Sequence, residues 1–329
     1  MNGKTTFYAA ALTAMMSMNT SALNIALSND DGWDAPGVQS LFTALRRAGH
    51  SVTLAGPSEN QSGGSASVDL DAANLQITKT AERGTASQYS VALTAGGSAS
   101  PGTAAQIAIS IAEQVGPVDL LVSGINAGAN TGAGTNISGT VGATIVGISN
   151  LTGERIPGIA ISTDEVDEIR DCPPAELANC RAANLAHYQV VAEWFVGFLE
   201  ELEQKPGGLK KQDGLLPDGI ALNINYPVTD QVAGVKSDVQ ALLFYRDGQP
   251  VGLDINCYGV CADLTVGETL TGGINGLIPM DTEREVKNGD APDYNAGYIT
   301  IVPINTDLTA PKSERKKFNK LVKKLNKNL

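Results

Sequence analysis

Two adjacent aspartates, Asp30 and Asp31, follow the short apolar run that ends at Ser28, in the stretch NIALSNDDGWDAPG. Neighbouring carboxylates repel each other, so they either cap a helix or bind something positively charged. Ser62 in NQSGGS and Asn126 in VSGINAG also come just after strand-like runs. Carboxylate, hydroxyl and amide oxygens are hard ligands, which suit Mg²⁺ or Mn²⁺ better than Zn²⁺. The four side chains therefore predict a divalent-cation site.

The segment after Asn126, INAGANTGAGTN, is rich in glycine and contains Asn130. Gly128, Gly132 and Gly134 allow backbone N–H groups to turn toward an anion and form a nest. Ser138, Gly139 and Thr140 then begin a run of small residues with a helical pattern, and the amino end of a helix binds anions. A cation opposite an anion cradle is the layout of a phosphoryl-transfer site. Each signal is weak when it occurs alone, and the three loops together carry the prediction.

Alternating strand and helix patterns predict how these loops come together. Strand-like runs occur at 24–27, 50–56, 118–124 and 156–162, and helical patterns at 35–49, 100–115, 138–151 and 184–202. Two further runs, 75–80 and 88–94, predict a hairpin or edge strands. The alternation is typical of a doubly wound, mostly parallel sheet, in which ligands bind beyond the carboxyl ends of the strands. We therefore expect the candidate residues at one edge of a Rossmann-like α/β core spanning residues 23–218.

The helical pattern ends at the linker-like stretch QKPGGLKKQDGLLPDG. Beyond it, the strand-like runs IALNINYP, QALLFYR, GLDINCYG and YITIVPIN are separated by turns, which predicts a β-rich C-terminal part at 219–310. Residues 311–329 contain eight Lys or Arg residues and one Glu, with apolar residues at helical spacing. We interpret this tail as a basic amphipathic helix docked by its apolar stripe, with contact to a membrane surface or polyanion as the alternative.

Residues 1–22 have the pattern of an export signal. A short segment with one lysine, Lys4, precedes the apolar run FYAAALTAMMSM, which is too short to span a bilayer. The small residues in NTSA favour cleavage after Ala22. The alternative is an ordinary N-terminal helix. We expect an exported protein, periplasmic or extracellular, without a transmembrane segment.

The four cysteines fall into two close pairs, Cys172 with Cys180 and Cys257 with Cys261. In an oxidising compartment two local disulfides are the natural interpretation, with free thiols or a metal site as alternatives. The net charge of −12 argues against a protein that coats a nucleic-acid polymer, because such proteins carry a basic surface.

Four further residues near the expected site have competing interpretations. His50 opens a predicted strand and His187 lies in a predicted helix, so both are expected to be structural. Trp33 either stacks on a base or covers the site. Asp34 either caps the helix at 35–49 or supports one of the ligands.

Several segments in order resemble the stationary-phase survival protein SurE family. They are LSNDDGWDAPGVQSL, GHSVTLAGPSENQSGGSAS, VDLLVSGINAGANTG with SGTVGA, IPGIAIS, LNINYP and DYNAGYITIVPINTDLT. The resemblance covers nearly all of residues 23–310. It implies a metal-dependent phosphomonoester hydrolase, a 5′/3′-nucleotidase or acid phosphatase that acts on nucleoside monophosphates or other small phosphomonoesters.

The resemblance also assigns roles to residues of this chain. The positions that match the family's ligands for a divalent cation, Mg²⁺ or Mn²⁺, are Asp30, Asp31, Ser62 and Asn126. The positions that match its phosphate-binding residues are Asn126, Asn130, Ser138, Gly139 and Thr140. Asp30 and Asp31 are also the candidate catalytic residues, as acceptors of a proton from the attacking water. The family's β-rich extension exchanges between subunits, which implies that residues 219–310 hold together a homodimer or homotetramer.

Two other classes of function compete with a hydrolase. A catalytically silent ligand- or partner-binding protein on the same scaffold would keep the fold and lose the cation ligands, all four of which are present. A dinucleotide-binding oxidoreductase would carry GxGxxG after the first strand, where this chain has NDDG.

Overall fold

The computed structural model describes most of the chain. The described residues are 22–70, 75–149, 153–204, 214–241, 245–246, 249–250, 253–256, 273–277, 288–307, 312 and 315–316. The predicted export signal up to residue 21, and all but three residues of the predicted basic tail, lie outside the described residues. Within the described part, no helix is long and apolar enough to cross a membrane.

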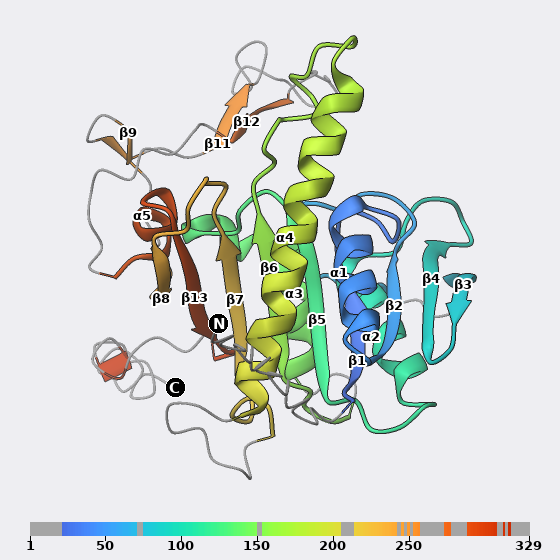
Figure 1. Cartoon of the computed structure of the whole chain (residues 1–329). Coiled ribbons are helices and arrows are strands. Elements are labelled where there is room, and N and C mark those ends of the chain that lie inside the picture. Colours follow the sequence, from blue (N-terminus) through green and yellow to red (C-terminus); the bar gives the residue numbers. More distant parts are fainter. Residues whose placement is uncertain are drawn as a thin grey trace, which may run out of the picture.

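The described chain is organised around a nine-stranded sheet with the strand order β3-β4-β2-β1-β5-β6-β7-β13-β8 (Figure 1). The strands are β1 (Asn24–Ser28), β2 (Ser51–Pro57), β3 (Leu75–Arg83), β4 (Ala86–Leu93), β5 (Leu120–Ala127), β6 (Gly158–Thr163), β7 (Ala221–Tyr226), β8 (Gly234–Ser237) and β13 (Tyr298–Ile304). The strands β4, β2, β1, β5, β6 and β7, in this spatial order, run parallel to one another. Strand β3 is antiparallel to its neighbour β4, and β13 is antiparallel to β7. The predicted α/β class with a mostly parallel sheet is confirmed, as is the hairpin β3–β4.

Helices cover both faces of the sheet (Figure 1). They are α1 (Pro36–Arg47) and α4 (Leu177–Glu203) on one face, and α2 (Pro101–Ala112) and α3 (Gly139–Ile148) on the other. Leu41 and Leu45 of α1 and Phe195 of α4 are fully buried in the first of two apolar cores, and the second is built largely from alanine. Helix α4 begins seven residues before the predicted start at residue 184, because its exposed first turns lack an apolar stripe.

The predicted boundary after residue 218 falls inside the large sheet. Strand β7 follows this boundary and pairs in parallel with β6, and β8 and β13 extend the same sheet. The remaining elements of the C-terminal part are β9 (Tyr245–Arg246), β10 (Gln249–Pro250), β11 (Leu253–Asn256), β12 (Gly273–Leu277) and the short helix α5 (Asp290–Asn295). Strands β9 to β12 form two separate two-stranded sheets. The part after residue 218 therefore contributes directly to the core architecture.

One of the two predicted disulfides is present. Cys172 and Cys180 are bonded, and the bond ties the segment before α4 to the first turn of that helix. Cys257 and Cys261 lie outside the described residues, so the second predicted disulfide stays a prediction.

Candidate active site

The candidate residues lie where the three neighbouring strands β2, β1 and β5 end. Asp30 and Asp31 follow β1, Ser62 follows β2, and Asn126 is the penultimate residue of β5. Parallel strands present their carboxyl ends at one edge, so these loops meet in space. The register of β5 against β6 shifts just before Asn126, so the ladder is irregular where the site begins.

Asp31 is the centre of the hydrogen bonds that join the three loops. Its Oδ2 accepts from the backbone N–H of Ala127, the residue after Asn126, at 2.9 Å. Its Oδ1 accepts from Asn60 Nδ2 at 3.0 Å and lies 3.4 Å from Ser62 Oγ. The Asn60 side chain also accepts from the backbone N–H of Ser62 at 2.8 Å. Asn60 therefore holds two of the predicted cation ligands in place.

Asp30 lies against the amino end of α3 and is only 3 % exposed. Its Oδ1 accepts from Thr140 Oγ1 at 2.5 Å, and Ser138 caps the helix by accepting from Val141 N at 3.1 Å. A Cβ atom at Gly139 would lie 2.7 Å from both Cβ and Oδ2 of Asp30. The predicted phosphate-binding turn is therefore in direct contact with the first aspartate, and only glycine fits at its second position.

The electrostatics of the pair favour a bound cation. Burial raises the pKa of Asp30, which the hydroxyl of Thr140 and the backbone at the start of α3 partly oppose. Burial, and then repulsion from Asp30, raises the pKa of Asp31 to about 7. Among the described residues no Lys or Arg forms an ion pair with either aspartate. A divalent cation would relieve this repulsion, so the oxygen donors present fit the predicted group.

The candidate cation site contains few charged ligands. Within the described ranges, His, Cys, Asp and Glu side chains do not gather in groups of three or more that could hold a metal. The candidate set therefore consists of two carboxylates, completed by the oxygens of Ser62 and Asn126. Such a mixed set of hard oxygens is compatible with Mg²⁺ or Mn²⁺, which keep several water ligands.

Most of the first half of the glycine-rich loop is bound to the protein itself rather than turned toward an open nest. Its N–H groups donate to protein oxygens: Gly128 to Thr163 O at 2.7 Å, Ala129 to Asp164 Oδ1 at 2.8 Å, Asn130 to Asn225 Oδ1 at 2.7 Å and Gly132 to Asp290 Oδ2 at 3.0 Å. The nest prediction is therefore wrong at Gly128 and Gly132, and it stays a prediction at Gly134. The side chain of Asn130 donates to Ser162 Oγ at 2.9 Å, on β6, where Ser162 pairs with Asn126. The amino end of α3 remains the predicted anion-binding element, and its first N–H groups, those of Gly139 and Thr140, contact the carboxylate of Asp30.

The remaining predictions near the site have mixed outcomes. The N-cap of α1 is Ala35, without a side-chain cap, so the cap predicted for Asp34 is wrong. His50 is buried, and its Nδ1 accepts from the backbone N–H of Leu23 at 3.2 Å. His187 Nε2 lies 2.7 Å from Thr163 Oγ1. Both histidines are thus tied into the fold, as expected.

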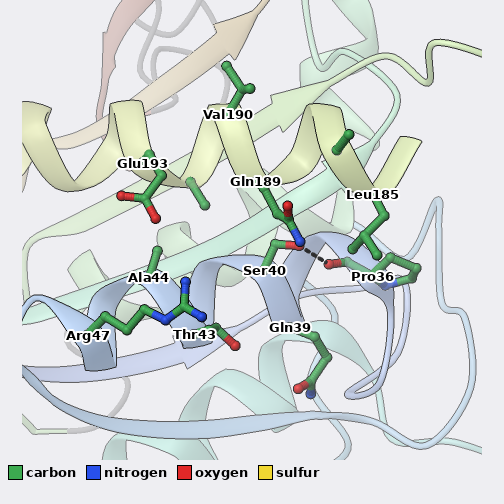
Figure 2. A pocket seen from close by; sticks show the side chains of 12 residues that line it. Pro36, Gln39, Ser40, Thr43, Ala44, Arg47, Leu185, Gln189, Val190 and Glu193 are labelled. Atoms are coloured by element: carbon green, nitrogen blue, oxygen red, sulfur yellow. Dashed lines mark hydrogen bonds between the residues drawn. The ribbon is translucent and has the colours of Figure 1, made fainter. Parts of the chain in front are cut away.

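A cavity of about 700 Å³ between α1 and α4 lies apart from this chemistry (Figure 2). Figure 2 places Arg47 and Glu193 at one end of the groove, and Pro36 and Leu185 at the other. None of the predicted site residues lines it. Its size alone gives no reason to move the candidate site away from the aspartates.

Sequence reasoning did not identify several residues that shape the site. Asn60 had a local signal, because an Asn two residues before Ser62 is the pattern of an Asx turn. No local sequence signal pointed to the roles of Asp164, Asn225 and Asp290. They bind the glycine-rich loop across 35, 95 and 158 residues of sequence, respectively.

Comparison with known proteins agrees with the fold and the motifs. The family model described as Survival protein SurE matches residues 25–246, so the chain belongs to the SurE family. The 5′/3′-nucleotidase SurE of Yersinia pseudotuberculosis is 30% identical over 295 residues, covering 88% of this chain and 92% of that protein. The 5′-nucleotidase SurE of Haemophilus ducreyi is 29% identical over 291 residues, covering 88% and 96%.

A solved structure has the same fold. The crystal structure of the SurE protein from Aquifex aeolicus matches with a TM-score of 0.62 and 21% sequence identity. The match covers 92% of this chain and 99% of that one.

Proposed function

We propose that this protein is a metal-dependent phosphomonoester hydrolase, a 5′/3′-nucleotidase or acid phosphatase acting on nucleoside monophosphates. The observation that carries the proposal is the contact between Asp30 and the amino end of α3, beside the second aspartate Asp31. Two carboxylates that would hold a cation adjoin the one helix end that would hold an anion. The names of the SurE relatives, 5′-nucleotidase and 5′/3′-nucleotidase, support the same reaction.

Each group has a role in this proposal. Asp30, Asp31, Ser62 and Asn126 would hold the divalent cation, Mg²⁺ or Mn²⁺. When bound, the cation supplies electrostatic stabilisation of the charge on the phosphoryl oxygens. Ser138, Gly139 and Thr140 orient the phosphate at the start of α3. Asn130 belongs to the same phosphate-binding set, and Asp30 or Asp31 accepts the proton of the attacking water.

We also propose that the protein works outside the cytoplasm as a homodimer or homotetramer. Its disulfide between Cys172 and Cys180 supports export, because such bonds persist in oxidising compartments. An exported nucleotidase would release phosphate from nucleotides in the surroundings. Signal cleavage after Ala22 is checked by N-terminal sequencing of the secreted protein, and the oligomer by light scattering.

The reaction is tested with residues 23–329 against p-nitrophenyl phosphate and a panel of nucleoside 5′- and 3′-monophosphates. We expect phosphate release from several members of the panel, with a clear preference among the bases. A folded protein that releases no phosphate from any of them, with either Mg²⁺ or Mn²⁺ present, would leave a binding protein on the same scaffold as the better description.

A further inference from the structure

The carboxylate of Asp290 is buried at the start of α5 and lies against the glycine-rich loop. Its side chain is completely inaccessible to solvent. Oδ1 accepts from the backbone N–H groups of Ala241 and Ala291, each at 2.8 Å, and Oδ2 accepts from Gly132 N at 3.0 Å. Burying a carboxylate costs free energy because the charge loses its water. Three backbone donors offset this cost, and in doing so they fix the backbone at these positions.

Side chains from the C-terminal part hold the loop from both sides. Gln240 Nε2 donates to the carbonyl oxygen of Gly132 at 2.7 Å, so both backbone groups of this glycine are bound. Asn223 and Asn225 on β7 donate to the carbonyl oxygen of Asn130 at 2.8 and 3.2 Å. These three side chains and that of Asp290 all come from beyond residue 218, whereas the loop follows β5.

The loop in turn sets the orientation of a predicted cation ligand. Asn126 Nδ2 donates to the carbonyl oxygen of Gly128 at 2.6 Å, while the N–H of Gly128 donates to Thr163 O. The direction of the Asn126 amide therefore depends on where Gly128 is held. Displacement of the loop would therefore rotate the amide of Asn126 and move its oxygen, the predicted ligand atom.

We propose that Asp290 is a positioning residue for the cation site: by fixing Gly132, it holds the loop that orients Asn126. It does not contact the predicted ligands itself. Its effects on cation affinity and on catalysis rest on the proposed function, whereas its effect on the order of the loop does not. The C-terminal part thereby contributes to the active site from within the same subunit.

The test compares Asp290→Asn with the wild-type protein. An asparagine has only one acceptor oxygen, so it cannot accept from Gly132 and from Ala241 and Ala291 together. We expect faster amide hydrogen exchange in the peptide 128–136 and a loss of Mn²⁺ affinity of about 10-fold to 100-fold, measured by calorimetry. The Mn²⁺ concentration for half-maximal phosphate release should rise by a similar factor, with a smaller change in kcat at saturating Mn²⁺.

Two further variants separate positioning from loss of folding. Gln240→Ala frees the carbonyl of Gly132 without leaving a buried charge, and it should weaken Mn²⁺ binding in the same direction even if Asp290→Asn does not fold. The control is Asp293→Asn. Asp293 lies on the same helix α5 as Asp290, and the variant weakens its ion pair of 2.6 Å with Lys236 on β8 instead of a contact with the loop. It should leave Mn²⁺ affinity unchanged.

The outcomes are distinct. The proposal is overturned if Mn²⁺ affinity stays within about twofold of wild type in both loop variants, or if Asp293→Asn weakens binding as much as they do. Wild-type protein that binds Mn²⁺ but hydrolyses no phosphomonoester would end the proposed function, and the calorimetric comparison would still decide the role of Asp290.

Discussion

Thr140 donates its hydroxyl to Asp30 over 2.5 Å, across 110 residues of sequence. The contact joins the first turn of α3 to the loop after β1, and both side chains are buried. The group predicted to hold phosphate and the group predicted to hold the cation are thus parts of one hydrogen-bonded unit.

Replacing Thr140 with valine should destabilise the protein and loosen Asp30. Valine keeps the shape of threonine but removes the donor, and a hydrogen bond to a charged group contributes about 1.5–3 kcal/mol. Urea unfolding without added metal should show a loss of that size in the free energy of unfolding. Thr140→Ser, which keeps the hydroxyl, should lose less than half as much, and equal losses would contradict the assigned role of this bond.

Gly139→Ala should greatly reduce activity because the new methyl group would overlap Asp30. Its Cβ would lie 2.7 Å from Asp30 Oδ2 and 2.8 Å from Pro101 Cγ. Overpacking of this kind costs about 1–3 kcal/mol, and here it displaces a predicted ligand. Gly134→Ala is the control, because no described atom beyond its chain neighbours lies within 4 Å of its Cβ position. Phosphatase kinetics on the two variants should differ by at least about tenfold.

Asn60→Ala should weaken cation binding by about 10-fold to 100-fold, as for other residues that orient metal ligands. The variant removes a donor to Asp31 and the acceptor for the Ser62 N–H. Calorimetric titration with Mn²⁺ measures the effect. Gln61→Ala, whose side chain donates only to the exposed carbonyl oxygen of Asn60, should bind Mn²⁺ like wild type. Unchanged affinity in Asn60→Ala would remove this residue from the site.

Protonation of His50 should make the fold less stable in mild acid. Its Nδ1 accepts from Leu23 N–H, and burial lowers its pKa below the ordinary value of about 6.5. The unfolded chain therefore binds this proton first, so the contribution of His50 is complete above about pH 6.5 and is lost as the pH falls toward the lowered pKa. His50→Gln, which keeps an acceptor, should unfold with a flatter dependence on pH between 7 and 5. The same slope in both proteins would contradict this.

The sequence was sufficient to predict the α/β class and the meeting of Asp31 with Ser62. Both follow from local periodicity together with the general rule that parallel strands end at one edge. It did not reveal that the C-terminal strands join the main sheet, because β13 reaches β7 as an antiparallel partner after a long connection. Strand patterns do not encode which sheet a strand joins.

At Gly128 and Gly132 the nest prediction failed for a related reason. Glycines at 128 and 132 do allow N–H groups to turn inward, but the acceptors are Asp290 and the carbonyl of Thr163. A glycine-rich run predicts backbone freedom and does not predict which long-range partner will use it. Asp34 does not cap α1, because Pro36 is the first residue of the helix and Ala35 therefore occupies the N-cap position.

The central claim is that Asp30 and Asp31 hold a catalytic cation, and metal-dependent phosphate release tests it most directly. Protein treated with EDTA should release no phosphate from the best nucleoside monophosphate, and Mn²⁺ or Mg²⁺ should restore the rate. Asp31→Asn, at the same metal concentration, should be slower by about 100-fold or more, because the cation supplies several kcal/mol of charge stabilisation. Full activity in EDTA, or in a folded Asp31→Asn protein, would contradict the account.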